Sequence, residues 1–160
     1  GRGYANKIKF ILVGNGKEYQ DCLAKAKEKK LLNNILLMKQ SVPKEEVPKI
    51  LSAIDISILP GSTDIICPIK ILEYMATETA VILPNYRCNK EVVTDNKDGL
   101  FFEPKNERDL ADKIELLLLK PELIHLFSNQ ARNTVVNKFS WEKTWGRVLD
   151  KYIENFNTSV

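Results

Sequence analysis

The segment over residues 56–84 constrains the fold most, because apolar runs alternate in it with a helix signal. An apolar run at 56–60 is followed by a turn-forming Gly61-Ser62-Thr63, and a second apolar run covers 80–84. Between them Pro68 begins a stretch of helical spacing, and proline suits a first helical position because it has no N–H to leave unpaired. This order predicts two parallel strands joined by a helix.

The start of this helix is a candidate anion site. The first N–H groups of a helix have no partner within the helix, and they carry the positive end of its dipole. We therefore expect the N–H groups of Ile69 and Lys70 to suit a phosphate. Glu73 lies further along the helix, where its carboxylate can accept hydrogen bonds from sugar hydroxyls. A plain surface pair between Lys70 and Glu73 remains the alternative.

Composition and charge narrow the class of protein. The chain has 160 residues, of which 44% are hydrophobic and 28% are charged, as in an ordinary soluble globular domain. A net charge of +3 gives no reason to expect a nucleic-acid partner. Cys22, Cys67 and Cys88 form no CxxC pair, so we expect no zinc site and a reducing compartment. No apolar run is long enough to span a bilayer, and the first residues lack a signal-peptide pattern.

Strand and helix signals alternate along the first hundred residues. We expect strands at 9–13, 35–38, 56–59, 80–83 and 100–102, and helices at 19–26, 47–54, 68–77 and 90–94. Such alternation predicts a doubly wound, Rossmann-like parallel sheet with helices on both faces, in a single α/β domain over residues 1–160. The continuously apolar strands favour burial on both sides.

Three more helices are expected after residue 105. Asn106 can cap the first, Pro121 can begin the second, and Ser140 can cap a terminal helix over about 140–156. An apolar stripe runs along this terminal helix and includes Trp141 and Trp145. We expect the stripe to pack across the domain or onto a neighbouring one, and not to stack on sugars.

The loops of interest all follow strands at the carboxyl end. These loops are 14–16, 39–42, 61–68 and 84–90. Ligands of open parallel sheets bind outside this end of the strands. All four loops lie at this same end of the predicted sheet, and this shared position is the main structural reason to expect a binding cleft.

In their order, these motifs resemble the retaining family 4 glycosyltransferases, also called glycosyl transferases group 1. The resemblance rests on Val13-Gly-Asn-Gly16, Val42-Pro43, 53–60, Pro68–Ala76, 91–100 and 139–141. It implies the C-terminal, donor-binding half of a two-domain GT-B enzyme, whose N-terminal half binds the acceptor. The implied chemistry is sugar transfer from a UDP-, GDP- or ADP-sugar with retention of configuration, without a metal or other cofactor.

The resemblance also implies roles for particular residues. Glu73 matches the second glutamate of the family's E-x7-E motif, which holds the donor ribose. The first glutamate would fall at Ile65, and Asp64 beside it is either a partial substitute or a loop-capping residue. The remaining donor-binding residues implied are Lys70, Ile69 and Pro68 at the diphosphate, Gly14 and Gly16 at the Gly-x-Gly turn, and Gln40, Ser41 and Val42 beside the base.

The family's diphosphate-binding Arg and Lys have no counterpart at the right distance before Gly14. We therefore interpret the chain as a fragment with little or no activity alone, and expect no catalytic residue in it; His125 and Cys67 are expected to be structural. The implied setting is cell-surface polysaccharide or glycolipid synthesis in the cytoplasm, with possible peripheral attachment of the full enzyme to the inner membrane face.

Two rival functions remain open. The first is a non-catalytic Rossmann-like module that binds a nucleotide or a protein, which the missing carboxylate at position 65 favours. The second is a nucleotide-sugar epimerase of GT-B type, whose required glutamate, aspartate and histidine we cannot place. A nicotinamide-dependent oxidoreductase is disfavoured, because its fingerprint needs a glycine where this chain has Tyr19.

Overall fold

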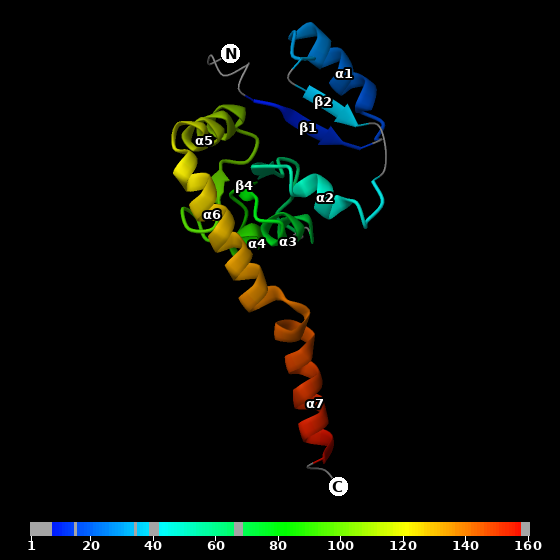
Figure 1. Cartoon of the computed structure of the whole chain (residues 1–160), viewed down its shortest axis with the longest axis vertical. Coiled ribbons are helices and arrows are strands. Elements are labelled where there is room, and N and C mark those ends of the chain that lie inside the picture. Colours follow the sequence, from blue (N-terminus) through cyan, green and yellow to red (C-terminus); the bar gives the residue numbers. More distant parts are fainter. Residues whose placement is uncertain (1–7, 15, 34, 39–41, 66–68, 158–160) are drawn as a thin grey trace. The chain divides into compact units, whose positions relative to one another are not determined.

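A computed structural model describes residues 8–157, except for 15, 34, 39–41 and 66–68 (Figure 1). Its contacts divide the chain into two compact units, Gly1–Val47 and Pro48–Val160. Each unit is described by itself. Whether both belong to a single domain over residues 1–160 stays a prediction.

The first unit is a β–α–β segment. It contains β1 (Phe10–Val13), α1 (Tyr19–Glu28) and β2 (Ile35–Met38), and the two strands pair in parallel with Phe10 opposite Ile35. All three elements were predicted by their apolar patterns. The prediction of a strand buried on both sides is wrong for β1, where Leu12 is 47% exposed. The described part of this unit offers a single helix, and one helix covers only one face of a sheet.

The second unit is built on a three-stranded parallel sheet. Its strands are β3 (Ile56–Ile58), β4 (Ala80–Pro84) and β5 (Leu100–Phe102), in the order β3-β4-β5. Its helices are α3 (Ile69–Ala76), α4 (Arg87–Lys90), α5 (Glu107–Leu119) and α6 (Pro121–Thr134), and α2 (Val47–Leu51) begins at the last residue of the first unit. Figure 1 shows α3, α4, α5 and α6 in green to yellow-orange.

Both faces of this sheet are buried, as the apolar runs predicted. On one face, Val81 of β4 packs in a cluster with Ile71 and Met75 of α3. On the other face, Ile82 packs in a cluster with Leu117 of α5 and Phe127 of α6. Neighbouring residues of β4 point to opposite faces, so each face receives its own set of helices. This arrangement confirms the predicted α/β fold class.

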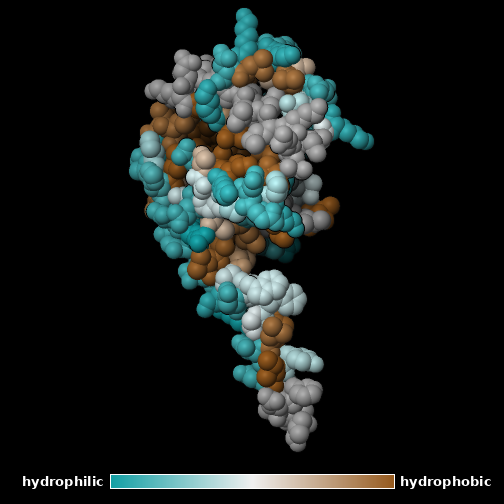
Figure 2. Space-filling view, turned by 45° about the vertical axis from the view of Figure 1, so that its right-hand side comes forward, coloured by the Kyte–Doolittle hydropathy of each residue, from teal (hydrophilic) through white to brown (hydrophobic). Residues whose placement is uncertain are grey.

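The chain after α6 continues as an extension of helical turns. Two π-helical turns, η1 (Val135–Phe139) and η2 (Glu142–Gly146), lead into α7 (Arg147–Asn157). Trp141 and Trp145 are 72% and 55% exposed, with ring centroids 6.1 Å apart. Figure 2 shows hydrophobic side chains along this helix. The stripe therefore does not pack across the core of its own unit, and its packing onto a neighbouring domain stays a prediction.

One predicted helix is misplaced. We expected a helix near 90–94, but α4 covers Arg87–Lys90 and is followed by turns. The N–H of Arg87 donates to the Asp64 carboxylate, 23 residues earlier, at 2.9 Å. A side chain from a distant loop thus begins this helix, and no local cap shows its position.

In the described ranges no helix is long and apolar enough to cross a membrane.

Candidate functional site

The site is built around α3, the helix whose start was predicted to bind an anion. Ile71 and Met75 lie one turn apart and are fully buried, which holds α3 against β4. At its other end, the Arg132 guanidinium of α6 donates to the Ala76 carbonyl. A cation at the last carbonyls of a helix is favoured by the helix dipole. These contacts hold α3 at both its buried face and its C-terminus.

A cavity of about 540 Å³ lies where β3 ends and α3 begins. Its lining residues come from both sides: Leu59, Gly61 and Ser62 follow β3, and Ile69, Lys70 and Glu73 belong to the first two turns of α3. The structure therefore brings together three of the predicted donor-binding residues, Ile69, Lys70 and Glu73. Pro68, predicted as the first residue of this helix, lies outside the described residues.

The polar side chains of this cavity are open to solvent. Lys70 and Glu73 are both exposed, and no ion pair joins them in the described part of the chain. The alternative of a surface pair between Lys70 and Glu73 is therefore not seen, and both groups remain available to a ligand. Burial raises the pKa of the neighbouring Tyr74 hydroxyl, and the carboxylate of Glu73 raises it further.

Asp64 has the loop-capping geometry. Its carboxylate accepts the backbone N–H of Arg87 at 2.9 Å and thereby begins α4. Ile65, at the position of the family's first glutamate, is 87% exposed. Position 65 therefore presents an apolar side chain to solvent, and the carboxylate of Asp64 is already engaged with the protein.

The other predicted donor residues belong to the first unit. The Gly16 carbonyl accepts the N–H of Tyr19 at 3.1 Å, which starts α1. Nothing lies within 4 Å of where a Cβ would stand at Gly14 or Gly16, so the fold does not require a missing side chain there. Val42 is half-buried, and Gln40 and Ser41 lie outside the described residues. How these residues sit relative to α3 stays a prediction.

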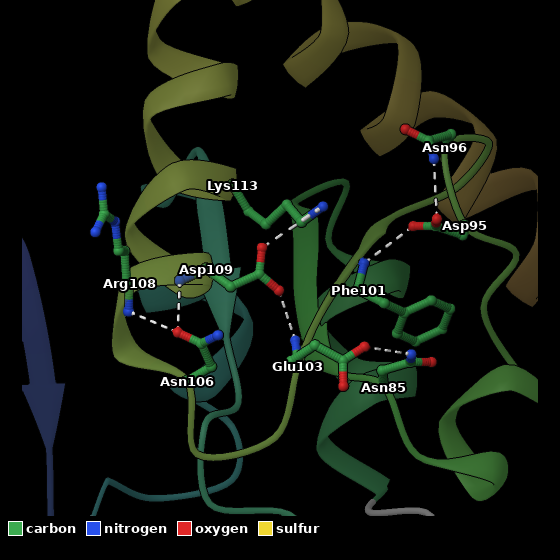
Figure 3. A network of polar contacts seen from close by, with 9 residues as sticks. All are labelled: Asn85, Asp95, Asn96, Phe101, Glu103, Asn106, Arg108, Asp109 and Lys113. Atoms are coloured by element: carbon green, nitrogen blue, oxygen red, sulfur yellow. Dashed lines mark hydrogen bonds and ion pairs between the residues drawn. The ribbon is translucent and has the colours of Figure 1, made fainter.

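A polar network at the ends of β4 and β5 was missed by sequence reasoning (Figure 3). Asn85 Nδ2 donates to Glu103 Oε1 at 3.0 Å, and the Glu103 N–H donates to Asp109 Oδ2 at 2.6 Å. Lys113 lies 3.9 Å from the other Asp109 oxygen. These residues line a cavity of about 460 Å³. Because these groups bond to one another, the network serves to join β4, β5 and α5.

Metal ligation has no candidate in the ranges that the structure describes. No group of three or more His, Cys, Asp or Glu side chains there is arranged to hold an ion.

The fold is that of the GT-B glycosyltransferases. The chain superposes on the sucrose-phosphate synthase of Thermosynechococcus elongatus with a TM-score of 0.80 and 22% identity, over 92% of this chain and 38% of that one. The C-terminal domain of a Francisella tularensis glycosyl transferase group 1 protein superposes with a TM-score of 0.71 and 19% identity, over 85% of this chain and 90% of that one. Anabaena HepE in complex with UDP-glucose superposes with a TM-score of 0.76 and 16% identity, over 95% of this chain and 41% of that one.

The chain belongs to the glycosyl transferases group 1, whose family model matches residues 4–134. It is 26% identical to the poly(ribitol-phosphate) alpha-N-acetylglucosaminyltransferase of Staphylococcus aureus strain COL, over 96% of this chain and 30% of that protein. It is 27% identical to an Escherichia coli UDP-Gal:alpha-D-GlcNAc-diphosphoundecaprenol alpha-1,3-galactosyltransferase, over 91% and 36%. The chain thus spans about a third of the length of these relatives.

Proposed function

We propose that this chain is the donor-binding part of a glycosyltransferase that takes its sugar from a nucleoside diphosphate sugar. The observation that carries the proposal is the cavity between the end of β3 and the start of α3, lined by Lys70 and Glu73. Parallel sheets bind ligands at this end of their strands. The names of the two relatives, with a UDP-sugar in one of them, support the same class of substrate.

The residues of the cavity have distinct roles in this proposal. The first N–H groups of α3 and the ammonium of Lys70 contact the diphosphate, where negative charge grows as the sugar leaves. Because these groups stabilise the leaving diphosphate, the proposed reaction needs no metal ion. Glu73 accepts hydrogen bonds from the ribose hydroxyls and thereby fixes the position of the donor in the cavity. This segment binds and orients the donor, and it supplies no nucleophile.

The proposal extends to the whole enzyme. We propose that an N-terminal domain of the full chain binds the acceptor, and that transfer proceeds with retention of configuration in the synthesis of cell-surface polysaccharide or glycolipid. The site of action is the cytoplasm, at the inner membrane face. Retention follows from the family resemblance, and the configuration of the product formed by the full-length enzyme, read by NMR, tests it. The two alternatives, a non-catalytic module and an epimerase, find no support among the relatives, which are named as transferases.

Calorimetric titration with UDP, GDP and ADP tests the role of Glu73. Glu73→Ala should weaken binding of the preferred diphosphate by about 1–3 kcal/mol, the cost of a lost hydrogen bond to a charged group. Glu122→Ala is the matched control, because Glu122 is an exposed glutamate in the first turn of α6 that does not line the cavity. Equal affinities of wild type and Glu73→Ala would remove Glu73 from the site.

A further inference from the structure

Three successive residues of α4 hold three successive residues of the loop that follows β3. The Arg87 N–H donates to Asp64 Oδ1 at 2.9 Å, and Cys88 Sγ donates to the Thr63 carbonyl at 3.3 Å. Asn89 Nδ2 donates to Ser62 Oγ at 3.3 Å. The two segments run in opposite directions, so the contacts form a small ladder. We call these three contacts the loop clamp.

Asn89 is the buried end of the loop clamp. Its side chain is fully buried, and its Nδ2 also donates to the Pro84 carbonyl at the end of β4, at 2.8 Å. Its Oδ1 lies 3.6 Å from Cys88 Sγ and shares the single S–H of that thiol with the Thr63 carbonyl. Because both N–H groups of Nδ2 are engaged, the buried amide has one favoured orientation, and turning it would leave these groups unpaired. Asn89 therefore ties Ser62 to the sheet.

The clamped loop forms one wall of the donor cavity. Gly61 and Ser62 line the cavity on the side of β3, and Lys70 and Glu73 line it on the side of α3. α3 is held in place by its own buried face, so the width of the cavity depends on where the loop lies. In the described residues, the polar groups that fix the loop from outside belong to α4: the backbone N–H of Arg87 and the side chains of Cys88 and Asn89.

We propose that Asn89 is a positioning residue of the donor site: by holding Ser62, it sets the distance between the loop wall and α3. The inference rests on the proposed donor-binding function. A loop held in the bound geometry binds more tightly, because less ordering remains to be done when the ligand enters. Asn89 itself does not line the cavity, so any effect it has on affinity acts through the loop.

A double-mutant cycle on Ser62 and Asn89 tests this. The ligand is whichever of UDP, GDP and ADP the wild-type chain binds. Ser62→Ala and Asn89→Ala should each weaken binding about tenfold, and the double variant should be no weaker than Asn89→Ala alone, because one contact is being removed twice. Ser62→Thr keeps the hydroxyl and should restore most of the affinity. Additive losses would mean that Ser62 acts on the ligand directly, and would overturn the inference.

The control separates positioning from stability. Ser128→Ala removes a serine hydroxyl of α6 whose bond runs to the His125 carbonyl, away from the cavity. Ser128→Ala should leave the affinity for the diphosphate unchanged, while its free energy of unfolding, measured in urea, should fall about as much as that of Ser62→Ala. Asp64→Ala loosens the exposed end of the loop clamp without touching the core, so it keeps the test valid if Asn89→Ala does not fold. Asp64→Ala should weaken binding and shift the amide resonances of Gly61 and Lys70 in the free, folded protein.

The outcomes also separate this inference from the proposed function. If the wild-type chain binds none of the three diphosphates, the proposed donor site and the positioning role fail together. If the wild type binds and folded Ser62→Ala and Asp64→Ala variants bind equally well, the positioning role alone is overturned.

Discussion

Gly99 lies where the core leaves no room for a side chain. A Cβ added there would lie 2.6 Å from Val81 Cγ2 and 2.8 Å from Val93 Cγ1, and both valines are buried in the core under α3. These distances are shorter than any normal contact between carbons, so the core would have to move. Glycine at this position permits β4 and the turn before β5 to approach closely.

Gly99→Ala should therefore destabilise the protein by about 1–3 kcal/mol, the usual cost of overpacking a core. Urea unfolding followed by circular dichroism measures this. Gly61→Ala is the control, because a Cβ there meets nothing within 4 Å, and its stability should stay within about 0.5 kcal/mol of the wild type. A Gly99→Ala variant as stable as Gly61→Ala would contradict the packing described here.

The hydroxyl of Tyr74, next to Glu73, should make the stability of the protein depend on pH. Burial, and then the charge of Glu73, raise the pKa of its hydroxyl, so the folded state holds this proton more tightly than the unfolded state does. The associated stability is complete below the ordinary tyrosine pKa of about 10 and is lost as the pH rises through the folded-state pKa. The free energy of unfolding should therefore fall above pH 10.

Tyr74→Phe removes that titration, so its unfolding free energy should fall less steeply than the wild type's above pH 10. Glu73→Gln should lower the pKa of Tyr74, which ultraviolet difference titration against Tyr74→Phe reports. Identical alkaline limbs for wild type and Tyr74→Phe would show that this hydroxyl is not the group responsible.

At the scale of elements, local signals explain what could be predicted. The apolar runs of β4 and β5 and the signals at Asn106 and Pro121 act within a few residues, so the sequence shows them directly. The position of α4 and the loop clamp could not be predicted, because their contacts join residues 23–27 positions apart. Of the predicted donor-binding residues, Ile69, Lys70 and Glu73 line one cavity, and they could be placed together because a helix start is a local pattern.

The cap of α5 is a local signal whose energy can be measured. Asn106 Oδ1 accepts the N–H groups of Arg108 and Asp109 at 3.1 and 3.0 Å. Asn106→Ala should cost about 0.5–2 kcal/mol of stability, since it leaves these two donors without a protein partner. Asn129→Ala, an exposed change within α6, should cost nothing, because alanine is the better helix former. Equal effects in urea unfolding would contradict the capping role.

At the scale of the whole molecule, the chain matches only part of the length of its relatives. It spans about a third of its curated relatives, and its terminal helix exposes an apolar stripe that includes Trp141 and Trp145. The cavity proposed to bind the donor, in contrast, is formed within the second unit alone, by β3, its loop and α3. The proposed donor binding can therefore be tested on this chain without any further domain.

Amide chemical-shift mapping with UDP, GDP and ADP tests the donor site most directly. The account predicts that one of the three binds selectively and that the shifts concentrate on Gly61, Ser62, Ile69, Lys70 and Glu73. Shifts confined to the second cavity, around Asn85 and Lys113, or no binding of any of the three, would contradict it.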